Sequence, residues 1–196
     1  MPASRGGPVR ATGPCAILIG GAPGTGKSTL AAALAPRLGA AVLDLDVATG
    51  PLTAVVCDLV GAVDLSDPRI ARLTRTPRYE TLYALAEDNL RAGISVILVA
   101  PFTTERSAEG RAGVTERLAG YVSPPVFVWL HLSDDEMVGR LARRNAVRDR
   151  AKTADPSEYL ASIGRDPPTG PHVALDGSQP VPALVERVLA HVSALF

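Results

Sequence analysis

The feature that most restricts the fold of this chain is a glycine-rich segment, residues 21–28, that holds one of its rare lysines. The segment matches G-x-x-x-x-G-K-[ST] at every position. A short apolar run, residues 16–20, precedes it, and a helix-like run, residues 29–38, follows it, which is the strand–loop–helix context that the pattern requires. Lys27 and Lys152 are the only lysines in the chain, so a chance match to a pattern that demands lysine would be rare.

The motif predicts a loop that binds polyphosphate. Its glycines let main-chain N–H groups turn toward phosphate oxygens, and the N-terminus of the following helix adds its positive end. We expect Lys27 to bridge the β- and γ-phosphates and the Ser28 hydroxyl to ligate Mg²⁺, so that ATP and Mg²⁺ are the expected cofactors. The predicted nucleotide-binding residues of the loop are Gly21, Ala22, Pro23, Gly24, Thr25, Gly26, Lys27, Ser28 and Thr29.

Short buried-type strands alternate with helical patterns along the rest of the chain. Further strands are expected at residues 40–45, 94–100, 125–132 and 172–175. Helices are expected at residues 79–91, 114–121, 134–144, 159–163 and 181–195, with weak helical periodicity at 52–60 and a loop over 64–78. This alternation predicts an α/β fold in which helices cover both faces of a parallel sheet. Ligands of such folds bind beyond the carboxyl ends of the strands.

Size and composition fit one ordinary globular domain of 196 residues. We expect a flexible tail over residues 1–14 and the folded domain over 15–196. The 20 Lys and Arg residues balance the 20 Asp and Glu residues, which counts against binding a nucleic acid polymer or an anionic membrane. The two cysteines form no CxxC and no apolar run approaches the length of a bilayer span, so a cytoplasmic protein is expected.

Two carboxylates follow the second expected strand, as Asp44 and Asp46. On an extended chain, side chains at i and i+2 point the same way. One could then hold the metal shell while the other accepts a proton from an attacking hydroxyl; the alternative is a pair of acids that caps a loop. The third and fourth strands end without the acid that motor and transport ATPases usually carry there. The guanine-reading N-K-x-D of GTPases is missing after the fourth strand.

A basic cluster follows the fourth expected strand. Arg140, Arg144 and Arg148 are spaced four residues apart, so a continuing helix would place them on one face. A lid over about residues 143–165 would bring such arginines onto the transferred phosphoryl group, where positive charge supplies much of the catalysis. We therefore expect Arg144 and Arg148 to be catalytic and Arg140 to contact the nucleotide. A solvated charged face is the alternative.

Taken with the residues 99–103, these motifs give the chain a family resemblance over about residues 15–195. It resembles the P-loop small-molecule kinases of the nucleoside-monophosphate-kinase-like superfamily, the group with shikimate kinase, gluconate kinase, chloramphenicol phosphotransferase and zeta-toxin-like proteins. The resemblance implies a three-layer αβα sandwich with five parallel strands in the order 2-3-1-4-5 and a lid after strand 4. It departs from shikimate kinases at Pro101-Phe102, where they carry a glycine pair, and its lid lacks the many arginines of adenylate kinases.

The same resemblance assigns expected roles to residues outside the loop. Adenine would pack near Asp176, Gly177 and Ser178. Asp46 would orient or deprotonate the acceptor, with Asp44 nearer the metal. Further candidate acceptor-site residues, expected in the loops around strands 2 and 3, are Arg78, Tyr79, Thr103 and Arg106.

The expected activity is therefore transfer of the γ-phosphoryl group of Mg·ATP to a hydroxyl of a small molecule, such as a sugar, a nucleoside, an antibiotic or another natural product. The expected partners are ATP and that acceptor, without a nucleic acid polymer or a membrane, in a monomer or a homodimer. Two alternatives stay open: a regulatory ATP-binding protein without turnover, and a zeta-toxin-like nucleotide or nucleotide-sugar kinase.

Overall fold

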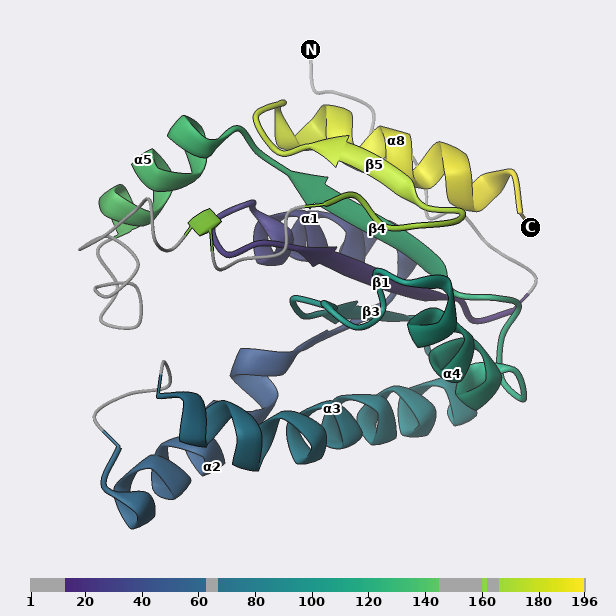
Figure 1. Cartoon of the computed structure of the whole chain (residues 1–196). Coiled ribbons are helices and arrows are strands. Elements are labelled where there is room, and N and C mark those ends of the chain that lie inside the picture. The colour runs from purple at the N-terminus through teal and green to yellow at the C-terminus, as the bar shows by residue number, and fades with distance from the viewer. Residues whose placement is uncertain (1–12, 63–66, 145–159, 162–165, 196) are drawn as a thin grey trace.

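The computed structural model describes residues 13–62, 67–144, 160–161 and 166–195. Strands and helices alternate along most of this length, as the buried apolar runs predict (Figure 1). The strands are β1 (Ala16–Gly21), β2 (Ala41–Asp44), β3 (Val96–Val99), β4 (Val126–His131) and β5 (Val173–Asp176). The helices are α1 (Lys27–Leu38), α2 (Leu45–Val60), α3 (Pro68–Arg91), α4 (Ala108–Leu118), α5 (Asp134–Arg144) and α8 (Val181–Ser193).

All five strands form one parallel sheet in the order β2-β3-β1-β4-β5, which confirms the expected order. β1 lies at the centre, where Ile17 pairs with Ile97 of β3 on one side and with Val126 of β4 on the other. The carboxyl ends of the strands therefore meet at one edge of the sheet. The glycine-rich loop follows β1 at the middle of that edge.

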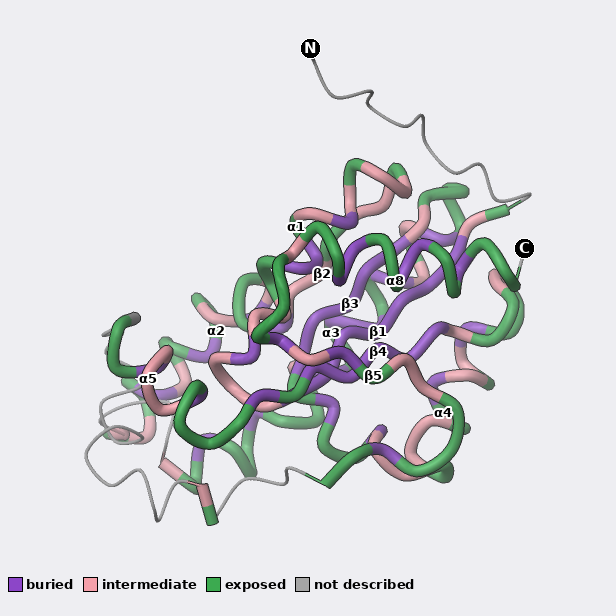
Figure 2. Tube along the Cα trace, turned by 90° about the horizontal axis from the view of Figure 1, so that it is seen from above, coloured by how far each residue is buried: buried purple, intermediate pink, exposed green. Residues whose placement is uncertain are grey.

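Helices cover both faces of the sheet and form two apolar cores. Because side chains alternate along a strand, Ala16 and Leu18 of β1 join one core while Ile17 and Ile19 join the other. The first core also holds side chains of α3 and α4, and the second holds side chains of α1 and α8. The buried trace runs through the middle of the molecule in Figure 2. This is the three-layer αβα architecture expected from the sequence.

The segment after β2 corrects one sequence-based expectation. β2 ends at Asp44 and helix α2 begins at Leu45, so Asp44 and Asp46 do not share an extended strand. The Asp44 carboxylate instead caps α2 and accepts hydrogen bonds from the N–H groups of Asp46 at 3.0 Å and Val47 at 3.4 Å. One oxygen of Asp44 therefore caps a helix, where the alternative expected a loop, while its other oxygen accepts a hydrogen bond from Ser28.

The expected loop over residues 64–78 is wrong from Pro68 onward, where α3 begins 11 residues before the expected helix at 79. Asp67 caps α3 through the N–H of Arg69, and proline at the first helical position has a favourable fixed φ. Similarly, α4 begins at Ala108 and not at residue 114, because the Ser107 hydroxyl accepts a hydrogen bond from the N–H of Gly110. In both cases a capping residue marks the true helix start.

Parts of three expected segments lie outside the described residues: residues 1–12 of the tail, residues 145–159 and 162–165 of the lid, and the corresponding part of the helix at 159–163. Leu160 packs against a small apolar cluster of Leu132, Met137 and Leu141, which also contacts Ala22 of the glycine-rich loop. Among the helices of the described residues, none is both long and apolar enough to cross a membrane.

Candidate active site

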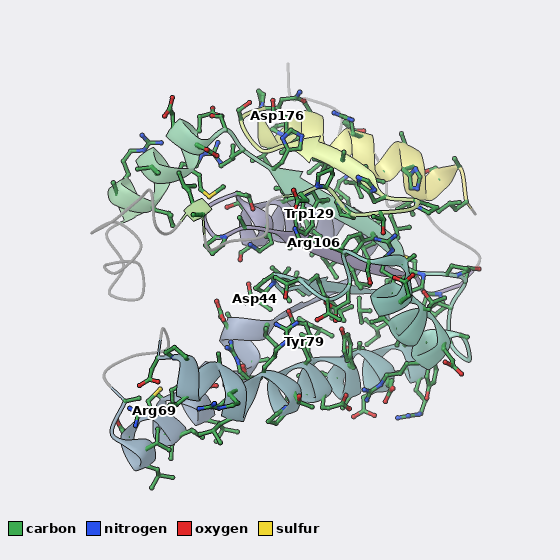
Figure 3. The ribbon with its side chains drawn as sticks, in the orientation of Figure 1. Asp44, Arg69, Tyr79, Arg106, Trp129 and Asp176 are labelled. Atoms are coloured by element: carbon green, nitrogen blue, oxygen red, sulfur yellow. The ribbon has the colours of Figure 1, made fainter. Side chains whose placement is uncertain are left out.

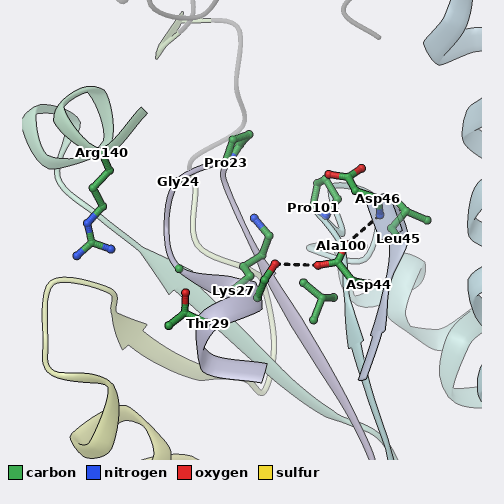
Figure 4. A pocket seen from close by; sticks show the side chains of 13 residues that line it. Pro23, Gly24, Lys27, Thr29, Asp44, Leu45, Asp46, Ala100, Pro101 and Arg140 are labelled. Carbon is green, nitrogen blue, oxygen red and sulfur yellow. Dashed lines mark hydrogen bonds between the residues drawn. The ribbon is translucent and has the colours of Figure 1, made fainter. Parts of the chain in front are cut away.

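A cavity of about 340 Å³ lies at the carboxyl ends of the central strands (Figure 4). Its floor is the glycine-rich loop and the start of α1, with Lys27, Ser28 and Thr29 in the lining. Outside the loop and α1, the lining comes from three segments. These are Asp44, Leu45 and Asp46 around the start of α2, Val99, Ala100 and Pro101 at the end of β3, and Arg140 of α5. The cavity therefore collects residues from segments that are distant in the sequence but adjacent at this edge of the sheet.

Backbone conformation explains why the loop requires glycine. Gly21, Gly24 and Gly26 have φ values of 137°, 86° and 99°, in the region that residues with a Cβ rarely adopt. At Gly21 a Cβ would also lie 2.4 Å from the carbonyl oxygen of Leu130. The loop consequently follows the backbone of β4 closely and leads into α1, whose first N–H groups lie at the cavity.

The lysine of the motif lies folded against its own loop. Lys27 Nζ donates hydrogen bonds to the carbonyl oxygens of Gly21 at 2.7 Å and of Ala22 at 2.8 Å. The buried hydroxyl of Thr25 donates to the same Ala22 carbonyl at 2.9 Å and braces the turn from inside. These contacts hold the ammonium group at the floor of the cavity, where an anion would meet it.

Ser28 and Asp44 form a pair of hard oxygen donors beside the lysine. The Ser28 hydroxyl donates to Asp44 Oδ2 at 2.8 Å, while Oδ1 of the same carboxylate caps α2 (Figure 4). Mg²⁺ prefers such oxygens and usually keeps waters and substrate phosphates as its other ligands. Among the described residues, no group of three or more His, Cys, Asp or Glu could hold a metal without such help. The pair therefore fits a magnesium ion shared with a nucleotide.

Asp46 faces the same cavity and is held from α3. Arg78 donates from its Nη2 to Asp46 Oδ1 at 2.6 Å and from its Nε to the Thr49 hydroxyl at 2.8 Å. The Arg78 side chain is 19% exposed, whereas that of Asp46 is 52% exposed. The structure thus brings two of the sequence-predicted residues together, with Arg78 orienting a carboxylate that solvent can reach.

The residues after β5 lie beside Arg140 and the loop. Arg140 Nη2 donates to the Gly177 carbonyl at 2.8 Å, and a Cβ at Gly177 would lie 2.5 Å from the carbonyl of Thr25. The Ser178 N–H donates to the Asp176 carboxylate at 2.9 Å, and this bond lowers the pKa of Asp176 below its usual value. Gly177 therefore lies against the predicted phosphate-binding loop, and an adenine position at residues 176–178 stays a prediction.

A protein-family comparison adds to this geometry. The model of a family described as an AAA domain matches residues 17–164, which include the loop, both acids and Arg140. The chain belongs to that AAA domain family. A search of curated proteins finds no match to this chain.

Three solved kinases share the fold of this AAA domain. An unliganded sugar kinase from Janibacter is 22% identical, covering 92% of this chain and 95% of that one, with a TM-score of 0.63. A gluconokinase from Sinorhizobium meliloti is 22% identical, covering 93% of each chain, with a TM-score of 0.61. The Mycobacterium tuberculosis APS kinase CysC, solved with AMPPNP and APS, is 19% identical. The match covers 92% of this chain and 98% of that one, with a TM-score of 0.62. Family and fold thus agree with the P-loop kinase resemblance.

Of two further predicted acceptor-site residues, Tyr79 is buried and Arg106 is partly buried (Figure 3). Tyr79 lies within α3, only 8% exposed, and its hydroxyl accepts a hydrogen bond from the Phe102 N–H at 3.1 Å. Burial, and then the charge of Glu105, raise the pKa of Tyr79 to about 12. The Arg106 guanidinium lies 5.9 Å from the ring centroid of Trp129 and donates to the Asp166 carbonyl at 3.1 Å. The structure therefore corrects the expected loop position of Tyr79, which lies within α3. Arg106 lies in the loop after β3 as expected, although it is not part of the described cavity lining.

The remaining predicted residues of the AAA domain are placed less fully. Thr103 is exposed in the loop after β3 and is not part of the described cavity lining. Arg144 ends α5, but its side chain lies outside the described residues, as does all of Arg148. Thr49, whose hydroxyl accepts a hydrogen bond from Arg78, is not among the residues predicted from the sequence. The capping signal of Asp44 could have revealed it, because a helix from Leu45 places Thr49 one turn after Asp46.

Proposed function

We propose that this protein transfers the γ-phosphoryl group of Mg·ATP to a hydroxyl of a small molecule. The observation that carries the proposal is one cavity that joins a lysine-bearing phosphate loop, the Ser28–Asp44 pair and the Asp46 carboxylate. The first two suit the nucleotide and its metal, while the third lies further along the wall, where a second reactant would enter. Support also comes from the family and from the three solved kinases of the same fold.

Charge neutralisation is the main task of this site. The β- and γ-phosphate oxygens would replace the carbonyls of Gly21 and Ala22 as partners of the Lys27 ammonium. Ser28 and Asp44 would hold Mg²⁺, which when bound offsets negative charge on the same phosphates. Arg140, and from the predicted lid Arg144 and Arg148, would add positive charge as the phosphoryl group moves.

The proposed step forms one bond and breaks another at the γ-phosphorus. The acceptor hydroxyl oxygen attacks in line, the bond from phosphorus to the β–γ bridging oxygen breaks, and ADP leaves with that electron pair. The hydroxyl proton passes to the Asp46 carboxylate, which Arg78 and Thr49 hold in place. Adenine would lie toward Asp176, Gly177 and Ser178.

A second candidate function has its own observation. A regulatory ATP-binding protein needs an exposed apolar surface for a partner, and α2 exposes several apolar side chains: Val47 by 78%, Leu52 by 74% and Leu59 by 80%. Such a protein would bind Mg·ATP tightly and yield no phosphorylated product. No observation of the described residues favours the nucleotide or nucleotide-sugar alternative over a general small-molecule acceptor.

The test replaces the proposed proton acceptor. We expect Asp46→Asn to lower kcat at least about 100-fold, the usual scale for a general base, while the Kd for Mg·ATP changes less than about twofold. ADP release over an acceptor library gives the rate, and calorimetry gives the Kd. Asp58→Asn is the control, because Asp58 is an exposed acid of the same helix outside the cavity lining.

Each outcome decides between named alternatives. Normal turnover by Asp46→Asn contradicts the role of Asp46. Saturable Mg·ATP binding without product from any acceptor supports the regulatory candidate. A wild-type protein that gives no heat with Mg·ATP contradicts both functions.

A further inference from the structure

A second cavity, of about 130 Å³, lies between α2 and α3. Its apolar lining includes Ala48, Leu52 and Val56 of α2 and Pro77 of α3. Arg78 also lines this cavity, and its ion-pair partner Asp46 lines the cavity above the glycine-rich loop. The Arg78–Asp46 pair therefore joins the walls of the two cavities, and a ligand in the second one would lie next to the proposed proton acceptor.

The threonines of this cavity have no free hydroxyl hydrogen to donate to a ligand. Four of them line it, and each donates its hydroxyl hydrogen to the carbonyl four residues earlier in its own helix. The O–O distances are 2.5 Å for Thr49, 2.8 Å for Thr53, 2.7 Å for Thr74 and 2.8 Å for Thr81. The donors are thus already used, so these threonines can only accept hydrogen bonds from a ligand or pack against it through their methyl groups.

The charge of the cavity is also already paired. Among its described lining residues, Arg78 alone carries a charge, and its guanidinium contacts the Asp46 carboxylate at 2.6 Å and the Thr49 hydroxyl at 2.8 Å. An anionic ligand would have to displace Asp46 from Arg78 and would leave that carboxylate without its cation. A polyol would lose hydrogen bonds to water and find few partners here. A neutral apolar group would neither displace Asp46 from Arg78 nor lose hydrogen bonds to water.

We propose that the α2–α3 cavity binds the apolar part of a neutral alcohol acceptor, with the alcohol hydroxyl directed past Arg78 toward Asp46. This inference rests on the proposed phosphotransferase function and narrows its acceptor. It separates this chain from the gluconokinase and the APS kinase of the same fold, since gluconate and APS are both anions.

Two leucines of α2 provide a matched pair of variants. Leu52 is 74% exposed and lines the cavity, whereas Leu59 is 80% exposed and is not part of the described lining. Because both side chains are largely in solvent, glutamine at either position should leave the fold intact, which circular dichroism checks. A second pair uses Ala48→Phe, which fills the cavity, against Ala54→Phe at an exposed position of the same helix.

The probe is benzyl alcohol, titrated by ligand-observed NMR against the full chain with and without Mg·AMPPNP. We expect saturable binding whose Kd rises about fivefold or more in Leu52→Gln and is lost in Ala48→Phe. Leu59→Gln and Ala54→Phe should keep the wild-type Kd within twofold, on the order of experimental scatter. D-Gluconate, titrated in parallel, should bind more weakly than benzyl alcohol.

The inference is overturned if benzyl alcohol does not saturate, if neither Leu52→Gln nor Ala48→Phe changes its Kd, or if D-gluconate binds more tightly. ADP release in the same samples separates this result from the proposed function. If benzyl alcohol binds in the cavity but no alcohol is phosphorylated, the proposed phosphotransferase function is contradicted and the apolar binding site is supported. If only anionic or polyhydroxylated acceptors are phosphorylated, the apolar binding site is contradicted and the proposed phosphotransferase function is supported.

Discussion

Phe102 adopts a φ of 47°, the one positive value among the non-glycine residues that the structure describes. An aromatic residue adopts this left-handed region at a cost of about 1–2 kcal/mol. Its surroundings hold it there: the ring is fully buried, 6.0 Å from Tyr79 and 6.1 Å from Phe127, and its N–H donates to the Tyr79 hydroxyl. Because Pro101 precedes Phe102 and lines the phosphate-loop cavity, Tyr79 positions a wall of the site without being part of its lining.

Tyr79→Phe should therefore destabilise the protein. The substitution leaves the Phe102 N–H buried without its partner, which costs about 1–3 kcal/mol in the free energy of unfolding. Urea denaturation measures the loss. Tyr121→Phe is the control, because the Tyr121 hydroxyl accepts only an exposed hydrogen bond from Arg91 and its removal should cost less than about 0.5 kcal/mol. Equal losses in the two variants would show that the Phe102 contact is unimportant.

For single residues, the sequence predicts a role where that role depends on neighbours in the chain. The glycine-rich loop could be predicted because its φ values and its place between strand and helix follow from neighbouring residues. Tyr79 could not, because its partner Phe102 is 23 residues away and is reached only when α3 packs on the sheet. Arg106 is a similar case, with its contacts at Trp129 and Asp166.

Among the elements, α2 shows why the site could be predicted only in part. Residues 45–60 contain Gly50, Pro51 and six valine or threonine residues, all poor helix formers. Local propensity therefore gives only a weak helical signal. Packing against α3 stabilises the helix instead. The two acids were therefore identified from their position in the chain, whereas the cap by Asp44 and the Asp46–Arg78 contact required the α2–α3 pair.

Helix α4 offers a test with two glycines. A Cβ at Gly110 would lie 2.1 Å from the Thr104 carbonyl, whereas a Cβ at Gly113 would meet nothing within 4 Å. Gly110→Ala should thus lower the free energy of unfolding by about 1–3 kcal/mol through overpacking. Gly113→Ala should raise it by about 0.5–1 kcal/mol through better helix propensity. Urea midpoints that move in the same direction would contradict the close packing of α4 on the loop after β3.

For the whole molecule, strand alternation was sufficient to predict the layers, and the family resemblance predicted the sheet order. Both depend on buried strands that pair in parallel and on helices that cover both faces. The choice of acceptor depends on how individual helices pack against each other. The cavity between α2 and α3 exists only through the packing of two helices whose extents the sequence predicted poorly. Its apolar character comes from side chains such as Leu52 and Val56, and from threonines whose hydroxyls donate within their own helices. No residue pattern alone reveals that these side chains line one cavity.

Binding of Mg·ATP should stabilise the entire domain, because a ligand that binds only the folded state shifts unfolding by mass action. At a free concentration 100 times its Kd, the nucleotide adds about 2.7 kcal/mol, which for a domain of this size raises Tm by roughly 5–10 °C. Differential scanning fluorimetry measures the shift. EDTA should remove most of it, since the Ser28–Asp44 pair then lacks the metal that links it to the phosphates.

Lys27→Ala should abolish this stabilisation, because the ammonium group that meets the phosphates is lost from the floor of the cavity. Arg69→Ala is the matched control: Arg69 is an exposed cation paired with Asp67 at the start of α3, far along the chain from the loop (Figure 3). Its Tm should still rise with Mg·ATP as in the wild type. Equal shifts in the two variants would mean that the nucleotide binds elsewhere, and the phosphate loop would then have no part in the stabilisation.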